Sequence, residues 1–138
     1  MSGSDAGGGL GAGGGPGVGG GLDASSGLAA GAVVDAASLP LAHEPVPAEQ
    51  VVAGSPTAAV AELTDTVGVW EHTPGVSTDV EADEVFVVLS GSATVEFDDP
   101  AVEAIELRPG SVVRLAAGMR TVWTVRETLR KVYVLPPG

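Results

Sequence analysis

The chain has 138 residues and a formal net charge of −12, with only six basic residues and no cysteine. This length allows one domain, and the shortage of Lys and Arg argues against binding to nucleic acid or to an anionic membrane surface. The lack of cysteine excludes disulfides, thiol catalysis and thiolate metal sites. No window approaches the roughly 20 apolar residues of a membrane span. Because no basic residue precedes Arg108, a secretory signal is not expected and we predict a cytoplasmic protein.

Residues 1–38 consist mainly of Gly, Ala and Ser. Glycine loses the most backbone entropy on ordering and has no side chain to bury, so this segment is predicted to be a flexible tail. A phosphate-binding loop in the glycine-rich run at 7–21 would need a strand before it and a helix after it, and the sequence indicates neither. A further hypothesis is that translation starts downstream of Met1. The folded domain is therefore expected at 39–138.

Short apolar runs, each of about strand length, recur from residue 57 onward. Turn-forming pairs separate them, among them Pro74-Gly75, Ser90-Gly91 and Pro109-Gly110. No stretch of ten or more residues carries a sustained helical stripe, so an all-β sandwich or barrel is predicted. The expected strands are 57–63, 66–72, 85–89, 93–97, 102–107, 112–115, 121–125 and 131–135, with an edge strand at 49–52.

Opposite charges are segregated along the chain. All six basic residues lie between Arg108 and Lys131, whereas most acidic residues precede them. Late strands of an antiparallel barrel pair with earlier ones, so we expect cross-strand ion pairs on the outer surface, each worth under about 1 kcal/mol. The acidic cluster at 79–84 lacks the spacing of a calcium-binding loop and is expected to form a solvated turn.

Several spaced motifs lie between residues 42 and 137. They are Gly54-Ser55-Pro56, Gly68-Val69-Trp70-Glu71, Pro74-Gly75, Asp83-Glu84, Val88-Leu89-Ser90-Gly91, Pro109-Gly110, Gly118, Trp123 and Arg130-Lys131-Val132-Tyr133. Together they resemble the cupin superfamily, and more closely its small single-domain branch related to the ureidoglycine aminohydrolase and ethanolamine-utilisation cupins. The resemblance implies a double-stranded β-helix, or jelly-roll, barrel with a pocket at its mouth. It also implies a homodimer formed by edge-strand exchange or sheet packing.

The cupin motifs normally supply three histidines and one glutamate to a metal ion. Glu84 and Gly91 match the end of the first motif, but residues 77–80, where its two histidines would fall, contain none. In the second motif, Thr121 stands where the histidine would be. One carboxylate alone does not hold a transition metal against water. We therefore expect neither a metal nor another cofactor.

The chain has two histidines, His43 and His72. His43 lies in the Pro-rich lead-in and is expected to be solvated. His72 shares a strand face with Trp70, and a metal site made of His72, Glu84 and Asp79 is the alternative to a metal-free barrel. We favour the metal-free interpretation because a histidine is more often a hydrogen-bonded side chain than a ligand.

Glu84 is the best-supported candidate for a functional residue. Strand alternation places it on the same face as Phe86 and Val88, where it would be partly desolvated. It could then act as a general acid or base, or accept a hydrogen bond from a ligand amine. The structural alternatives are an ion pair with Arg114 or Lys131, or exposure to solvent.

The other candidates for ligand contact fall into three chemical classes. Aromatic side chains would form the walls of a pocket, or alternatively fill the core. Basic side chains would bind an anionic group of the substrate, or alternatively lie on the outer face. A methionine at the barrel mouth would be a flexible lining residue. With Glu84, the expected ligand contacts are Trp70, His72, Arg114, Met119, Trp123, Lys131 and Tyr133.

Three functions remain open, because one fold can serve many. The first is a metal-free cupin that binds a small polar metabolite in the barrel. The second is an enzyme, aminohydrolase-like or isomerase-like, that uses Glu84 on a small nitrogen-containing carboxylate. The third is a structural domain whose mouth is filled by its own side chains. Loss of the metal ligands favours the first over the second.

Overall fold

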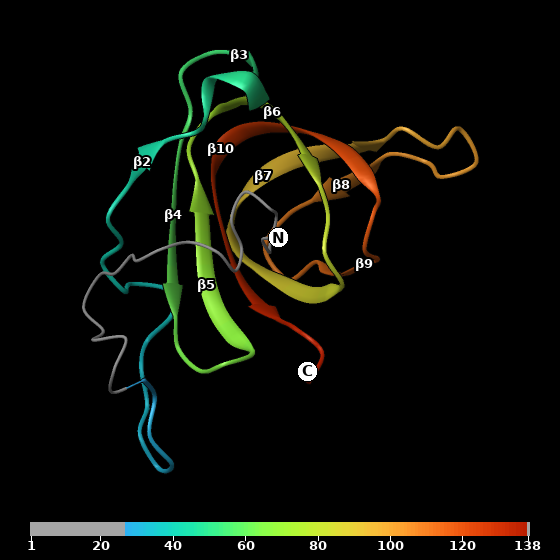
Figure 1. Ribbon diagram of the computed structural model, residues 1–138. Coiled ribbons are helices and arrows are strands. Elements are labelled where there is room, and N and C mark those ends of the chain that lie inside the picture. Colours follow the sequence, from blue (N-terminus) through green and yellow to red (C-terminus); the bar gives the residue numbers. More distant parts are fainter. Residues whose placement is uncertain (1–26, 138) are drawn as a thin grey trace.

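The structure is a computed structural model that describes residues 27–137, and the regular structure in this part of the chain is almost entirely β-strand. The strands curl into a barrel around a common interior (Figure 1), which confirms the all-β jelly-roll prediction. Within the described residues, no helix is long and apolar enough to cross a bilayer. The elements are β2 (Glu44–Pro45), the 3-10 turn η1 (Ala48–Gln50), β3 (Val51–Ala53), β4 (Thr57–Glu62), β5 (Val67–His72), β6 (Gly75–Val80), β7 (Glu84–Phe97), β8 (Ile105–Leu107), β9 (Val112–Leu115) and β10 (Arg120–Val134).

Two long strands, β7 and β10, hold the barrel together. The first part of β10 pairs with β6 on one side and with the end of β7 on the other. The last part of β10 pairs with β5 and with the beginning of β7. All of these pairings are antiparallel, and β8 and β9 extend the sheet from β7. Figure 1 shows β7 and β10 winding around the interior, opposite the wall made by β4 and β5.

The sequence predicts a turn at Ser90-Gly91, but β7 continues through it. Gly91 has a φ of 95°, and a Cβ atom at this position would lie 2.1 Å from the carbonyl oxygen of Thr128. The register between β7 and β10 shifts in this region, between Val125 and Lys131. Glycine therefore allows the two strands to bend and cross closely. The expected strands at 85–89 and 93–97 are both part of β7, and those at 121–125 and 131–135 both fall on β10.

The remaining strand predictions agree with the structure to different degrees. The expected strands at 57–63, 66–72 and 112–115 correspond to β4, β5 and β9. The expected strand at 102–107 is shortened to β8, and the expected edge strand at 49–52 is the turn η1 followed by β3. No strand was expected at β6, because its first residue, Gly75, follows proline in a turn signal.

Part of the segment at 28–41 packs against the outside of the barrel, whereas residues 29–33 are exposed in a loop that projects from it (Figure 1). Leu28, Val34, Ala36 and Leu41 lie against a cluster formed by Leu39 and outward-facing side chains of the sheet. The Leu28 amide donates to the Leu63 carbonyl at 2.7 Å. Packed structure therefore begins before residue 39, where we expected the folded domain to start. The glycine-rich run at 7–21 lies outside the described residues.

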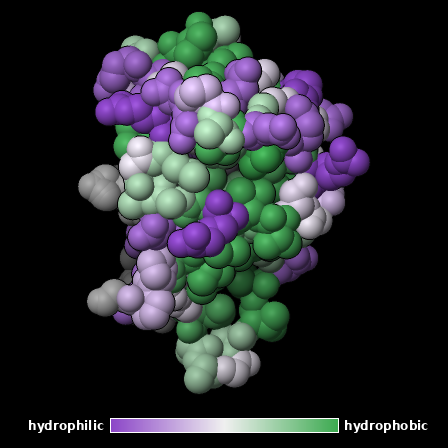
Figure 2. Space-filling view, turned by 90° about the vertical axis from the view of Figure 1, so that its right-hand side faces the viewer, coloured by the Kyte–Doolittle hydropathy of each residue, from purple (hydrophilic) through white to green (hydrophobic). Residues whose placement is uncertain are grey.

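The outer surface carries some of the expected ion pairs. Arg126 lies 2.9 Å from Glu106, and Arg130 lies 2.8 Å from Glu71. Lys131 is different, because its side chain is completely buried. Figure 2, seen from the side of β8 and β9, shows hydrophilic residues gathered near the top of the molecule and a band of hydrophobic residues across its middle.

Candidate functional site

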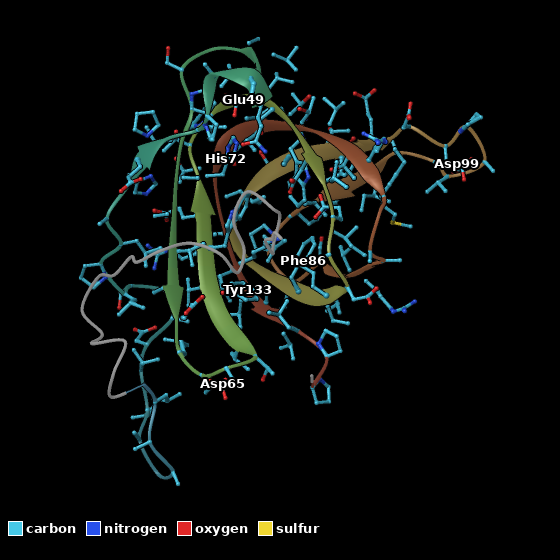
Figure 3. All side chains as sticks on the ribbon, viewed as in Figure 1. Glu49, Asp65, His72, Phe86, Asp99 and Tyr133 are labelled. Carbon is cyan, nitrogen blue, oxygen red and sulfur yellow. The ribbon has the colours of Figure 1, made fainter. Side chains whose placement is uncertain are left out.

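The barrel interior is formed by side chains on the inward faces of β5, β6, β7 and β10. In the sheet register, Lys131 of β10 lies opposite Trp70 of β5, and Tyr133 lies opposite Phe86 of β7. Figure 3 shows His72, Phe86 and Tyr133 within the curl of the sheet, whereas Asp65 and Asp99 lie at turns outside it. The interior therefore gathers aromatic and polar side chains from strands far apart in the sequence.

Lys131 and Glu84 form a buried ion pair at the centre of this interior. The Lys131 ammonium lies 2.7 Å from Oε2 of Glu84, and neither side chain is exposed to solvent. The same ammonium lies 4.1, 4.6 and 5.0 Å from the ring centroids of Phe86, Trp70 and Trp123, within the range of cation–π attraction. Glu84 therefore points inward, and of the alternatives left open by the sequence it takes the ion pair with Lys131.

Glu81 is a second interior carboxyl group, and sequence reasoning missed it. Its Oε2 atom accepts hydrogen bonds from the Thr121 hydroxyl at 2.7 Å and from the Trp123 indole at 3.0 Å. Its backbone pairs with Gly118 and Met119 in the turn before β10. The prediction of a solvated turn at 79–84 is wrong here, because Asp79, Glu81 and Glu84 are only 6%, 3% and 3% exposed.

Burial changes the protonation of this group of side chains. Burial, together with the nearby Glu81 carboxylate, raises the pKa of Asp79 to about 9. Burial also raises the pKa of Glu81, although the Lys131 ammonium and two hydrogen bonds oppose this. At neutral pH, Asp79 is therefore protonated and the interior holds less negative charge than three carboxylates would give it.

His72 is buried in the interior but is held by protein atoms. Its Nδ1 donates to the Thr73 carbonyl at 2.7 Å, so its Nε2 accepts from the Ser77 hydroxyl at 3.0 Å. Burial lowers the pKa of His72 to about 4, and the imidazole is neutral at pH 7. In residues 27–137, no group of three His, Asp or Glu side chains is arranged to hold a metal ion. The alternative site of His72, Glu84 and Asp79 does not fit a metal.

His43 is not simply solvated, as the sequence predicted. Its Nδ1 lies 2.8 Å from the Thr57 hydroxyl, and its Nε2 lies 2.7 Å from Oε1 of Glu71. Glu71 also accepts a hydrogen bond from Nε of Arg130. Together with His43, Arg130 holds the pKa of Glu71 below its usual range against the opposing effect of burial. His43 therefore belongs to a partly exposed network with Thr57, Glu71 and Arg130.

The eight side chains predicted to contact a ligand are not all brought together. Six of them are buried in or beside the interior: Trp70, His72, Glu84, Trp123, Lys131 and Tyr133. Arg114 does not join them. It is exposed on β9 between the inward-facing Val113 and Leu115, so its side chain lies on the outer face. Whether the six interior side chains contact a ligand stays a prediction.

Met119 lies directly before β10, and its expected role as a lining residue at the barrel mouth stays a prediction. It is partly buried, packs against the interior cluster together with Phe97, and accepts a hydrogen bond at Sδ from the Ala116 amide at 3.5 Å. Met119 and Phe97 line a pocket of about 390 Å³ between the loop after β7 and the turn before β10.

Three comparisons place this geometry among known proteins. A family model described as the EutQ-like cupin domain matches residues 61–133, which is more than half of the chain. A search of curated proteins finds no match. Solved structures with a similar fold include the EutQ protein of Clostridium difficile (TM-score 0.51, 17% identity), which matches over 59% of this chain and 69% of that chain.

Two further structures share the fold. A DUF861 family protein from Pseudomonas syringae has a TM-score of 0.60 at 18% identity over 74% of this chain and 46% of that chain. A protein from Rhizobium leguminosarum has a TM-score of 0.50 at 24% identity over 62% of this chain and 84% of that chain. At these identities the likeness shows the fold alone, whereas the family model matches the sequence itself. The chain thus belongs to the family of EutQ-like cupin domains, which confirms the resemblance seen in its motifs.

Proposed function

We propose that this cupin domain binds a small polar metabolite in its barrel without the help of a metal. The observation that supports this is a set of three buried polar atoms without a hydrogen-bond partner in the described part of the chain: Nε1 of Trp70, Oε1 of Glu81 and Oε1 of Glu84. A buried polar atom left unpaired costs about 1–3 kcal/mol. A ligand that pairs with these atoms would recover part of that cost.

The proposal that no metal is needed rests on the side chains around Glu84. Oε2 of Glu84, in the family's ligand position, is already paired with the Lys131 ammonium. Both ring nitrogens of His72 are engaged by Thr73 and Ser77. A metal ion would find only the unpaired Oε1 of Glu84, next to a buried ammonium that repels it, and it would have to break a histidine hydrogen bond to gain one imidazole.

The alternative is an enzyme that uses Glu84 on a small nitrogen-containing carboxylate, for which the family resemblance suggests ureido compounds. We favour binding over catalysis because Glu84 is held by Lys131, and a general base must be able to reach the proton it removes. In addition, neither basic residue proposed to hold the substrate carboxylate is available. Arg114 is on the outer face, and Lys131 is paired.

The two tryptophans of the chain, Trp70 and Trp123, both line the interior, so intrinsic fluorescence reports on what enters it. We expect a ligand among ureides, amino acids and short carboxylates to change the emission saturably and to raise the melting temperature. A ligand at 100 times its dissociation constant stabilises the folded state by about 2.7 kcal/mol. Arg114→Gln is the matched control and should bind equally well. If no compound of the panel shifts either signal, the proposal is wrong.

The Glu84→Gln variant separates binding from chemistry. Ammonia release from the same ureides is measured for both proteins. Turnover by the native protein that Glu84→Gln loses while it retains ligand binding would favour the enzyme. Binding by the native protein without turnover supports our proposal.

We also propose that the domain forms a homodimer through the outer face of β9, β7 and β10. Val112, Val85 and Val134 on this face are 70%, 41% and 45% exposed. In the sheet, Val85 lies opposite Val134, and Val87 lies opposite Val112, so these valines are neighbours. These exposed valines, with Arg114 opposite Val85 on the same face, form an apolar patch that a second copy related by a two-fold axis would cover.

The oligomeric state is tested by light scattering coupled to gel filtration. We expect a dimer for the native chain and a monomer for Val112→Lys, because a lysine at this position would place charge in the interface. Val33→Lys is the control, since Val33 is 91% exposed but lies far from this face in the N-terminal segment. A monomeric native chain would contradict the dimer.

A further inference from the structure

We infer that the barrel selects a neutral or cationic ligand that donates N–H groups, such as a primary amide or a ureido group, and rejects carboxylates. This inference rests on the proposed binding function and names the ligand class. It differs from the sequence-based expectation, in which Arg114 and Lys131 hold an anionic group of the substrate. Three features of the interior support it: the lack of a free cation, the excess of acid, and the kind of hydrogen bond each unpaired atom can make.

Among the residues that the structure describes, no buried cation is free to receive an anion. Lys131 is paired with Glu84 and surrounded by three aromatic rings. The other buried basic side chain, Arg130, bonds to Glu71 and to the carbonyl oxygens of Ala36 and Leu39 on the outer side of the sheet. A carboxylate that entered the barrel would find no unpaired positive charge.

The interior also contains more acid than base. Asp79, Glu81 and Glu84 are buried and interact electrostatically with one another, and the single ammonium of Lys131 faces them. His72 is neutral and adds no positive charge. Because Asp79 is protonated at neutral pH and Lys131 neutralises Glu84, the charge that would repel an extra carboxylate is that of Glu81 in its ionised form. An entering carboxylate would also lose its hydration without gaining a free cation, whereas a neutral molecule meets neither penalty.

The unpaired atoms require a ligand with both a donor and an acceptor. Oε1 of Glu84 belongs to a carboxylate in an ion pair and can only accept. Nε1 of Trp70 can only donate. Oε1 of Glu81 accepts when that group is ionised, and donates when it is protonated, because its Oε2 already receives two donors. An amide or ureido group supplies N–H and C=O side by side and satisfies all three atoms, whereas a carboxylate supplies acceptors only.

The unpaired atoms belong to one cluster of side chains. The ammonium that binds Glu84 lies 4.6 Å from the Trp70 ring and 5.0 Å from the Trp123 ring. The Trp123 indole donates to the other oxygen of Glu81 at 3.0 Å. The rings of Trp70 and Trp123 are in turn 5.5 Å apart. The three side chains that carry unpaired atoms are therefore linked by direct contacts through Lys131 and Trp123.

Acetamide and acetate are the matched probes. They have the same heavy-atom skeleton, but acetamide carries an NH₂ group where acetate has its second carboxylate oxygen. Tryptophan fluorescence of the native protein is titrated with each at constant ionic strength and pH 7, with urea as a second N–H donor. We expect saturable changes with acetamide and urea, and a dissociation constant at least tenfold higher for acetate. Ligand-detected saturation transfer to the methyl group of each probe gives an independent readout.

The outcomes separate this inference from the function on which it rests. Acetate binding as tightly as acetamide, or more tightly, overturns the inference and leaves a metabolite-binding barrel. Failure of acetamide, urea and the ureides, with a short carboxylate of the panel binding, also overturns the inference alone. Failure of every compound overturns both.

The Trp70→Phe variant tests the donor directly, because it keeps an aromatic ring and removes the N–H group. We expect its dissociation constant for acetamide to rise about fivefold or more. Trp123 remains as the fluorophore. The control Glu106→Gln removes a fully exposed acid and should leave the constant unchanged. If Trp70→Phe binds acetamide as tightly as the native protein, Nε1 of Trp70 does not contact the ligand. If that variant fails to fold, the saturation-transfer comparison on the native protein still decides between amide and carboxylate.

Discussion

The ammonium nitrogen of Lys131 lies 2.7 Å from Oε2 of Glu84, although the two residues are 47 positions apart and neither side chain touches solvent. Both ions lose their hydration on folding, and their mutual attraction has to offset that loss. Such a pair contributes little net stability compared with an apolar pair of the same size. Removal of one partner is much more harmful, because the other charge stays buried without compensation.

The first prediction concerns this ion pair. Lys131→Met should lower the free energy of unfolding by about 3–5 kcal/mol, because Glu84 is left as a buried, unpaired carboxylate. The double variant Lys131→Met with Glu84→Leu should recover most of that loss, since no charge is then buried. Guanidinium chloride unfolding of the single and double variants measures both values. A single variant within about 1 kcal/mol of the native protein would contradict this account.

The second prediction is that stability falls as the pH rises from 6.5 to 9. Asp79 has a pKa of about 9 in the folded chain, against an ordinary value of 3.8, so across this range the folded state holds a proton that the unfolded state has lost. Stability then decreases by up to about 1.4 kcal/mol per pH unit. The raised pKa of Glu81 acts in the same direction.

The contribution of His72 has the opposite sign and a different range. Its pKa is about 4 in the folded chain and 6.5 ordinarily, so between these values the unfolded state binds the extra proton and stability rises with pH. Above pH 6.5 this contribution is constant. Asp79→Asn should therefore flatten the decline between pH 6.5 and 9, and its Oδ1 can still accept from the Val80 amide. Melting temperatures at intervals of half a pH unit test this, and an equally steep decline in the variant would rule out Asp79 as its source.

The third prediction concerns the N-terminal segment on the outer face. Nη1 of Arg130 donates to the carbonyl oxygens of Ala36 and Leu39, both at 2.8 Å, and its Nε donates to Glu71. Arg130→Met should therefore loosen the segment at 28–41 and increase the hydrogen exchange of its amides, including that of Leu28. Exchange in β7 should change less, because the interior is intact.

Arg126→Met is the control for Arg130→Met. Arg126 is also on β10, but its pair with Glu106 is on the exposed surface, where ion pairs contribute little. Exchange in residues 28–41 should therefore stay as in the native chain. Equal exchange in the two variants would show that the hydrogen bonds of Arg130 do not hold the segment.

The resemblance of the spaced motifs to cupins was sufficient to predict the jelly-roll fold and the inward orientation of Glu84, and strand alternation then placed Phe86 and Val88 on the same face. The sequence left the partner of Glu84 open between Arg114 and Lys131. That choice depends on the register of β10 against β5 and β7, which shifts between Val125 and Lys131, where β10 passes close to Gly91. Local periodicity carries no information about such a register.

The burial of Asp79 and Glu81 could not be predicted from the sequence for a different reason. A run of acidic residues is ordinarily solvated, and nothing local indicates that Thr121 and Trp123, some 40 residues later, supply hydrogen bonds to Glu81. The alternation of Asp79 and Glu81 with exposed Val80 was a signal for an edge of the interior, since Val80 points outward between them. The prediction of a solvated turn gave more weight to the charge of these residues than to their alternation with Val80.

The fourth prediction tests the bend that lets β7 and β10 enclose the site. Gly91 and Gly110 both have a φ of 95°, where an L side chain is strained, but they differ in their surroundings. A Cβ atom at Gly91 would lie 2.1 Å from the Thr128 carbonyl oxygen, whereas one at Gly110 would have no neighbour within 4 Å. Gly110→Ala should cost about 1–2 kcal/mol from backbone strain alone. Gly91→Ala should cost at least twice as much, because β10 has to move away. Guanidinium chloride unfolding of the two variants gives the comparison, and equal losses would mean that β10 does not depend on the close approach at Gly91.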